Sequence, residues 1–235
     1  MKEYQDNEMS IMEHLEELRE RILWILITFF TTSGICLFYT DNISHILQQP
    51  AAGIKFLQLA PGEYLFACIK IAIYSGFLFS CPFGIYQIIQ FILPGLTLQE
   101  SSYIIPLLSG SIILFFGGVL FAYQILAPAA LGFLMQYGSE IIEPLWSFEE
   151  YLNFISILLF STGITFQIPI IQIILGIFNI VSYQKMAKYW KYVIFMSTII
   201  GAILTPSTDP ITQIIMTLAI VGLYFIGIII LKIFQ

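Results

Sequence analysis

Long runs without a charged residue divide the chain. A spanning helix needs roughly 17–25 apolar residues, whereas an outer-membrane barrel alternates apolar and polar residues over strands of about ten residues. The pattern therefore predicts an all-α polytopic membrane protein with six transmembrane helices. The six uncharged runs are Ile22–Thr40, Ile71–Gln99, Ser101–Ser139, Tyr151–Gln184, Tyr192–Thr208 and Pro210–Leu231.

The expected spans differ in length. We expect them at about 22–40, 66–89, 104–127, 151–177, 191–205 and 211–231, within a single membrane domain over residues 1–235. The fifth is confined between Lys191 and Asp209, and its end meets Pro206. A helix of about 14 residues reaches roughly 21 Å, against a hydrocarbon core of about 30 Å. The sixth is also expected to be short, so this pair needs a thinner bilayer, shielding or a partner.

Composition supports a membrane protein and excludes one class of partner. The chain has 235 residues, of which 58% are hydrophobic and 10% are charged. Soluble domains carry about 25% charged residues. The formal net charge of −6 argues against nucleic acid, because a phosphate-binding surface needs clustered basic residues.

The few basic residues fall mainly on one side of the predicted membrane domain. Six spans place both termini together, and by the positive-inside rule that side is cytoplasmic or its organellar equivalent. This side collects seven of the 9 basic residues, namely Lys2, Arg19, Arg21, Lys185, Lys188, Lys191 and Lys232. The opposite side is acidic, with Asp41, Glu63, Glu140, Glu143, Glu149, Glu150 and Asp209.

The N-terminal segment, residues 1–21, is the most densely charged part of the chain. Ser10 and Glu13 have the spacing of a capping box, which predicts an amphipathic helix at the membrane surface that runs into the first span. Glu17 and Arg21 have the spacing of a favourable ion pair. The polar face is either a solvated surface or, together with Glu100 in the connection after the second span, an acidic site for arginine side chains.

Polar residues and prolines inside the spans are few. Gln167 is expected to bond a neighbouring helix or freed backbone, with a substrate role as the alternative. Thr205, Asp209 and Gln213 form a small polar cluster around the turn between the last two spans. Helix kinks are expected at Pro82, Pro106, Pro128 and Pro169. Kinked helices favour a concave bundle. The alternative is that these prolines are only the ordinary irregularities of membrane helices.

The residues needed for catalysis or metal binding are missing from the spans. The 2 histidines, His14 and His45, lie outside the predicted spans, and no phosphate-binding loop, zinc-protease or serine-hydrolase motif occurs. No acidic or basic residue occupies the middle of a span, as pumps usually require. We therefore expect no metal, no cofactor and no enzymatic activity, and the 3 cysteines are interpreted as buried small hydrophobic residues.

Several motifs in combination resemble the TatC subunit of the twin-arginine protein translocase, in its plastid and cyanobacterial form. The resemblance runs over nearly the whole chain. It rests on HLEELRER at 14–21, SCPFGIYQ at 80–87, FILPGL at 91–96 with Glu100, FAY at 121–123 with Pro128, FQIP at 166–169 and LTPSTDPITQ at 204–213.

The resemblance implies a signal-peptide receptor. The family is a core component of a translocase that moves folded proteins across a membrane with the proton gradient, without ATP, and its partners are the twin-arginine signal peptides of these precursors. By position, Glu17 and Glu100 match the family's recognition carboxylates, with Arg19 and Phe91 beside them.

The resemblance also implies protein partners and a location. Thr205 and Gln213 match a cluster that contacts single-span subunits of the TatA/TatB (Tha4/Hcf106) type, and further TatC copies and the lipid bilayer are the other partners. Pro50, Pro82 and Pro169 are expected to be structural. Gln167 stands where the family often has glutamate, and an amide at this position resembles the plastid and cyanobacterial branch. We therefore expect a thylakoid membrane with a stromal N-terminus, or else a bacterial inner membrane.

Two other function classes remain as alternatives to the receptor. A small polytopic solute or ion transporter would show counterflow of a solute in liposomes that contain this protein alone. A membrane-embedded enzyme would need a reactive or metal-binding group within a span.

Overall fold

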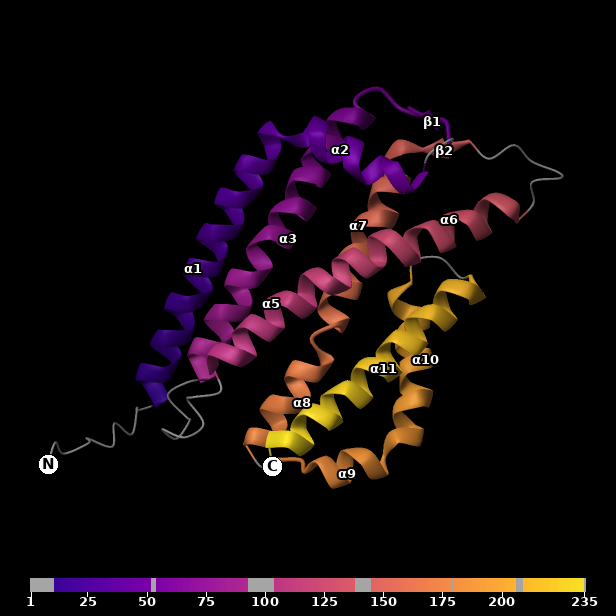
Figure 1. Ribbon diagram of the computed structural model, residues 1–235. Coiled ribbons are helices and arrows are strands. Elements are labelled where there is room, and N and C mark those ends of the chain that lie inside the picture. Colours follow the sequence, from indigo (N-terminus) through magenta and orange to yellow (C-terminus); the bar gives the residue numbers. More distant parts are fainter. Residues whose placement is uncertain are drawn as a thin grey trace, which may run out of the picture.

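The computed structural model describes residues 11–51, 54–92, 104–137, 145–178, 180–205 and 209–234, and these are almost entirely helical. The long helices run side by side as a bundle, and the start of α1 and the end of α11 lie at the same end of it (Figure 1). The helices are α1 (Ile11–Phe38), α2 (Thr40–Gln48), α3 (Glu63–Ile92), α5 (Ile104–Phe121), α6 (Ala127–Gln136), α7 (Phe148–Thr165), α8 (Ile168–Ile177), α9 (Tyr183–Lys188), α10 (Trp190–Leu204) and α11 (Pro210–Phe234).

Within the described chain, five helices are long and apolar enough to cross a membrane, and a further apolar helix is shorter. Five are long, namely Met12–Phe38, Glu63–Phe91, Ile105–Gln136, Phe148–Ile177 and Pro210–Ile233. The sixth is Trp190–Leu204, with 15 residues. At 1.5 Å per residue it is about 22 Å long, so the expected short fifth helix is present.

The last helix differs from the expectation of a short span. α11 has 25 residues because Pro210 itself opens the helix, where its missing N–H is not needed, and because the helix continues past Lys232. Of these last two described helices, α10 is therefore the short one.

The N-terminal segment is helical and runs into the first span, as expected. α1 is one continuous helix of 28 residues, about 42 Å long, that contains both the charged segment and the apolar one. Its charged first turns extend in line with the apolar part (Figure 1). Ser10 of the predicted capping box lies outside the described residues.

The predicted proline kinks have different outcomes. A π-helical turn, η3 (Ala122–Leu126), comes before Pro128 and joins α5 to α6. Pro169 is in the first turn of α8, so that α7 ends at Thr165 and α8 begins anew at Ile168. Pro82 lies inside the unbroken helix α3, and Pro106 lies in the first turn of α5, where neither ends a helix. A proline breaks a helix only where the carbonyls that it frees find no other arrangement.

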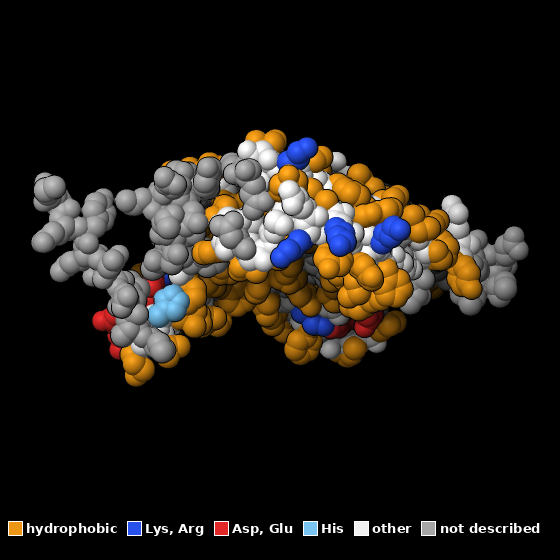
Figure 2. Space-filling view, turned by 90° about the horizontal axis from the view of Figure 1, so that it is seen from below, with side chains coloured by type: hydrophobic (Ala, Val, Ile, Leu, Met, Phe, Trp, Pro, Cys, Tyr) orange, Lys and Arg blue, Asp and Glu red, His pale blue; other side chains and the backbone are white. Residues whose placement is uncertain are grey.

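The core lies where α3, α6, α7 and α11 meet. It contains the fully buried Ile71, Leu126, Ile155 and Met216. One side of the bundle is hollowed between α1 and the helices of the C-terminal half, and the hollow is lined with hydrophobic side chains (Figure 2). The predicted concave shape is therefore present.

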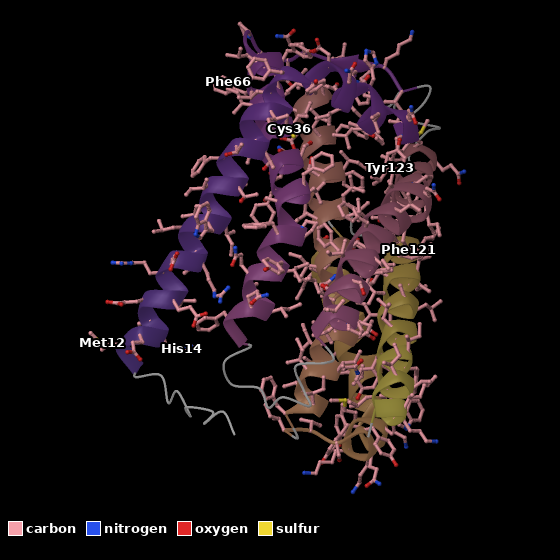
Figure 3. The ribbon with its side chains drawn as sticks, turned by 60° about the vertical axis from the view of Figure 1, so that its left-hand side comes forward. Met12, His14, Cys36, Phe66, Phe121 and Tyr123 are labelled. Atoms are coloured by element: carbon pink, nitrogen blue, oxygen red, sulfur yellow. The ribbon has the colours of Figure 1, made fainter. Side chains whose placement is uncertain are left out.

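A cap of short elements covers the end of the bundle opposite the termini. It consists of α2, the 3₁₀ turn η1 (Gln49–Ala51), which contains Pro50, and the parallel strands β1 (Phe56–Leu57) and β2 (Trp146–Ser147). Tyr123, at that end of Figure 3, donates its hydroxyl to the Ile46 carbonyl at 2.7 Å. The cap thus joins the segments that precede α3 and α7 to each other and to the helices.

Candidate functional site

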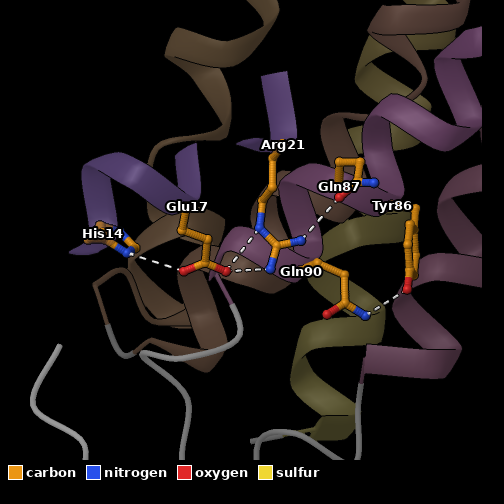
Figure 4. Close-up of polar contacts among 6 residues, drawn as sticks. All are labelled: His14, Glu17, Arg21, Tyr86, Gln87 and Gln90. Atoms are coloured by element: carbon orange, nitrogen blue, oxygen red, sulfur yellow. Dashed lines mark hydrogen bonds and ion pairs between the residues drawn. The ribbon is translucent and has the colours of Figure 1, made fainter. Parts of the chain in front are cut away.

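The charged end of α1 carries the predicted carboxylate Glu17. Arg21, one turn later, donates Nε to Glu17 Oε1 at 3.0 Å and also pairs with it through Nη2 (Figure 4). His14 Nδ1 lies 3.8 Å from the other oxygen, Oε2. Only 20% of the Glu17 side chain is exposed. The ion pair expected from the sequence spacing is therefore present, and it lies in a partly desolvated place.

Two contacts tie this end of α1 to the end of α3. Arg21 Nη1 donates to Gln87 Oε1 at 3.1 Å. The His14 ring stacks on the Phe91 ring, with centroids 4.2 Å apart and planes at 19°, and in Figure 3 His14 lies on the side of α1 toward α3. The structure thus brings Phe91 next to the surroundings of Glu17. The contacts of His14 and Gln87 were not predicted, although the two residues lie within the motifs HLEELRER and SCPFGIYQ.

One oxygen of Glu17 keeps an open acceptor. Glu17 Oε2 is buried and has no hydrogen-bond partner among the described residues. A carboxylate oxygen that is shielded from water without a donor is unfavourable, and a guanidinium N–H would satisfy it.

A shallow cavity of about 430 Å³ runs along the same part of α1. Its lining is acidic, with Glu13, Glu16, Glu17 and Glu20, together with Arg19 and Leu23. Arg19 is exposed and lines this cavity from the side of α1 that does not meet Gln87. Glu100 lies outside the described residues, in the connection between α3 and α5.

Gln167 bonds a neighbouring helix, as one of the two interpretations expected. Ser111 of α5 donates its hydroxyl to Gln167 Oε1 at 2.5 Å, and Gln167 Nε2 donates to the Ser111 carbonyl at 3.0 Å. Gln167 is the residue before α8, directly after the break at the end of α7. Its amide therefore fastens the break in this span to α5.

The polar residues between α10 and α11 are bonded mainly within the chain. Asp209 is 1% exposed, and its Oδ2 accepts from the backbone N–H of Thr212 at 2.8 Å, so that it caps α11. The Thr205 hydroxyl donates to the Gly201 carbonyl at 2.9 Å. Gln213 Nε2 reaches from α11 to the Thr198 carbonyl at 3.3 Å, the longest of these bonds. Gln213 is therefore the member of this cluster most easily released.

The acidic side that the sequence predicted is largely used for internal contacts. Buried Glu63 accepts from the backbone N–H groups of Leu59 and Ala60 and from the Ser147 hydroxyl. Glu149 pairs with Lys70. Four of the seven acidic residues there, counting Asp41 with its Tyr64 bond, are held in the cap or at a helix start. Glu140 and Glu143 lie outside the described residues.

Comparisons with known proteins agree on one family. The family described as "Sec-independent protein translocase protein (TatC)" matches residues 13–218. A tatC-like protein, ycf43, of Gracilaria tenuistipitata var. liui is 66% identical over 97% of this chain and 96% of its own length. The TatC protein of Synechocystis sp. is 50% identical over 95% of this chain and 88% of its own. The chloroplastic TATC of Pisum sativum is 43% identical over 94% of this chain and 64% of its own.

A solved structure extends the likeness to the fold. The crystal structure titled "Twin Arginine Translocase Receptor- TatC" superposes with a TM-score of 0.80 at 36% identity, covering 94% of this chain and 99% of that one. Both the sequence and the arrangement of helices thus match the same proteins. This chain belongs to the TatC family of Sec-independent protein translocase proteins.

Proposed function

We propose that this chain is the signal-peptide receptor and a core subunit of a twin-arginine translocase, which moves folded precursor proteins across a membrane. Its membership of the TatC family and its likeness to a twin-arginine translocase receptor support this function over a small-solute transporter. The receptor acts by binding and rearrangement, without catalysis by its own side chains, and transport draws on the proton gradient.

The single observation that carries the recognition step is the state of Glu17. Arg21 holds one carboxylate oxygen, and the other is buried without a hydrogen-bond partner among the described residues. A guanidinium group of the signal peptide pairs with this second oxygen. Because the site is only partly exposed to water, such a pair is stronger than the roughly 0–1 kcal/mol of an exposed one.

The second arginine of the signal pairs with Glu100, which follows α3 in the chain. α3 supports this arrangement because its end is fastened to α1 by Gln87 and Phe91. Arg19, which lies in the acidic cavity, limits the cavity's negative charge and so disfavours basic peptides without the twin-arginine spacing. The apolar part of the signal then lies along the hydrophobic hollow of the bundle (Figure 2).

Single-span subunits of the TatA/TatB (Tha4/Hcf106) type dock at the turn between α10 and α11. α10 is shorter than the hydrocarbon core, and a neighbouring helix relieves this mismatch. Gln213 is held within the chain by one long hydrogen bond, so it exchanges that bond for one to the partner. Further TatC copies complete the complex.

The membrane is the thylakoid, and the start of α1 is on the stromal side. A chloroplastic relative supports the compartment. The lysines of α9, α10 and α11 lie at the same end of the bundle as the start of α1, and that end faces the stroma by the positive-inside rule.

Site-specific crosslinking of a twin-arginine precursor tests the receptor. Glu17→Lys combined with Glu100→Lys is expected to abolish the crosslinks, because like charges then replace both ion pairs. The matched control, Asp41→Lys with Glu150→Lys, makes the same change in net charge at two exposed positions at the opposite end of the bundle and should retain most crosslinking. Native gels check that each variant still assembles.

Charge reversal gives a stricter version of this test. A precursor whose two arginines are replaced by aspartates should fail with the original receptor and regain crosslinks with the double lysine variant. If the original precursor still crosslinks undiminished to the double lysine variant, Glu17 and Glu100 are not the receptor site.

A further inference from the structure

A second groove lies far from Glu17, between α10 and α11. Its volume is about 390 Å³, within the range of roughly 300–1,000 Å³ that is typical of ligand pockets. Tyr192, Val193 and Met196 line it from α10, and Ile220 and Tyr224 line it from α11.

The interior of this groove is apolar. The hydroxyl of Tyr224 donates to the Met186 carbonyl of α9 at 2.8 Å, and the hydroxyl of buried Ser197 donates to the Ile194 carbonyl at 2.8 Å. Both hydroxyls are thus turned to the backbone of the protein. What remains for an occupant is a hydrocarbon surface.

Two lysines adjoin, along the chain, residues that line one end of the groove. Lys188 directly precedes the lining residue Tyr189, and Lys191 directly precedes Tyr192. With Lys185 and Lys232 they make an exposed basic group at the end of the bundle that carries α9, where Figure 2 shows Lys and Arg side chains beside hydrophobic ones.

These lysines have no acidic partner within the described part of the chain. None of its ion pairs includes them. The one acidic residue described between 180 and 234 is Asp209, which lies at the opposite end of α10 and α11. This charge is therefore open to an anion from outside the protein.

The surroundings of the lysines are those of a lipid headgroup region. Lys191 Nζ lies 5.9 Å from the centre of the Trp190 ring, and Tyr189 and Tyr192 stand on either side of them. Tryptophan and tyrosine gather at the membrane interface, and basic pockets between membrane helices bind anionic headgroups. The apolar groove begins at this level and continues into the membrane.

We propose that this groove binds one acyl chain of an anionic membrane lipid, and that Lys188 and Lys191 hold its headgroup. A helix does not fit as well, because helices are about 10–12 Å wide and the groove would hold roughly one turn. The lipid fills the space beside the short helix α10 and fastens it to α11. This site is independent of signal-peptide recognition.

The fluorescence of Trp190 reports the occupant. In the full chain with Trp24→Phe and Trp146→Phe, Trp190 is the remaining tryptophan. The protein is placed in phosphatidylcholine vesicles that contain a small fraction of brominated phosphatidylglycerol or of brominated phosphatidylcholine. We expect the anionic lipid to quench Trp190 preferentially, and Lys188→Gln with Lys191→Gln to reduce that preference roughly fivefold for each lysine.

Native mass spectrometry separates a bound lipid from the surrounding bilayer. The unmodified chain should retain one phosphatidylglycerol molecule, and Val193→Phe, which fills the groove, should lose it with the lysines intact. The matched controls are Lys2→Gln with Lys55→Gln, and Leu218→Phe, an exposed position of α11 that does not line the groove. Both controls should retain the lipid.

Three results would overturn the proposal. The first is equal quenching of Trp190 by the two brominated lipids. The second is retention of phosphatidylglycerol in Val193→Phe, which would mean that the lysines attract the lipid without the groove. The third is crosslinking from Met196 to the helix of a single-span subunit, without retained lipid, which would make the groove a protein interface.

Discussion

Single residues of the same type have different roles in this molecule because their surroundings differ. Glu17 keeps one carboxylate oxygen without a donor among the described residues. Glu63 instead accepts from Leu59 N at 2.5 Å, Ala60 N at 3.1 Å and Ser147 Oγ at 2.5 Å. Glu17 therefore keeps an acceptor for the proposed signal-peptide arginine, whereas Glu63 is committed to the cap and connects the segments that precede α3 and α7.

Replacement of Glu63 is expected to loosen the cap. Glu63→Ala removes all three acceptor contacts and leaves the donors unpaired, so we expect the thermal unfolding midpoint in detergent to fall by several degrees. Glu63→Gln keeps an amide oxygen for the backbone donors and should lose less. Exposed Glu150, replaced by alanine, is the control and should leave the midpoint unchanged. Equal midpoints for Glu63→Ala and the control would mean that the hydrogen bonds of Glu63 add nothing to stability.

At the scale of elements, α1 depends on a single neighbour among the long helices. It packs on α3, and it lies at the edge of the bundle (Figure 1). The two helices approach closely at Gly76, where the Thr32 hydroxyl donates to the Gly76 carbonyl at 3.0 Å. A Cβ atom at Gly76 would lie 2.6 Å from the Cα of Ser33. Because this contact is with backbone, rotation of a side chain cannot relieve it.

Gly76→Ala is therefore expected to push α1 away from α3 and to destabilise the protein by about 1–3 kcal/mol. The matched control is Gly34→Ala on α1, since a Cβ there meets no atom within 4 Å, and a helical glycine replaced by alanine gains up to about 1 kcal/mol. Unfolding midpoints in detergent measure both. A Gly76→Ala protein as stable as the Gly34→Ala protein would contradict a tight crossing. Since α1 carries Glu17, weaker binding of a twin-arginine peptide should accompany the loss of stability.

At the scale of the whole molecule, charge and architecture agree on two unlike ends. The end with the start of α1 and the end of α11 carries the arginines and most lysines. The end with α2, β1 and β2 carries Lys55 and Lys70, and Lys70 is paired with Glu149. The distribution of unpaired basic residues therefore orients the bundle.

Protease treatment of intact thylakoids tests this orientation. Trypsin added from the stromal side should cleave at the exposed Lys185, Lys188 or Lys191, and it should leave Lys55 uncut until the membranes are solubilised. Mass spectrometry of the fragments identifies the cleaved bonds, and a lumenal marker protein that stays intact is the control. Cleavage at Lys55 in sealed membranes would reverse the proposed orientation.

The sequence by itself determined the class of protein, the number of membrane segments, the short fifth helix and the ion pair of Glu17 with Arg21. These properties are local, because hydropathy is decided within about twenty residues and an i,i+4 pair lies within one helical turn. The family resemblance also came from short motifs, and three of these, at 14–21, 80–87 and 91–96, contain the residues that contact one another at the ends of α1 and α3.

Only the tertiary structure decided which polar groups are already used. The contacts that matter most join residues far apart in the sequence, namely Arg21 with Gln87, His14 with Phe91, and Glu63 with Ser147. Nearly uniform apolar helices carry little periodicity to show which faces meet, so the sequence could not predict these pairs. The structure therefore turned the predicted acidic side of the molecule into an internally bonded cap and left Glu17 with an open acceptor.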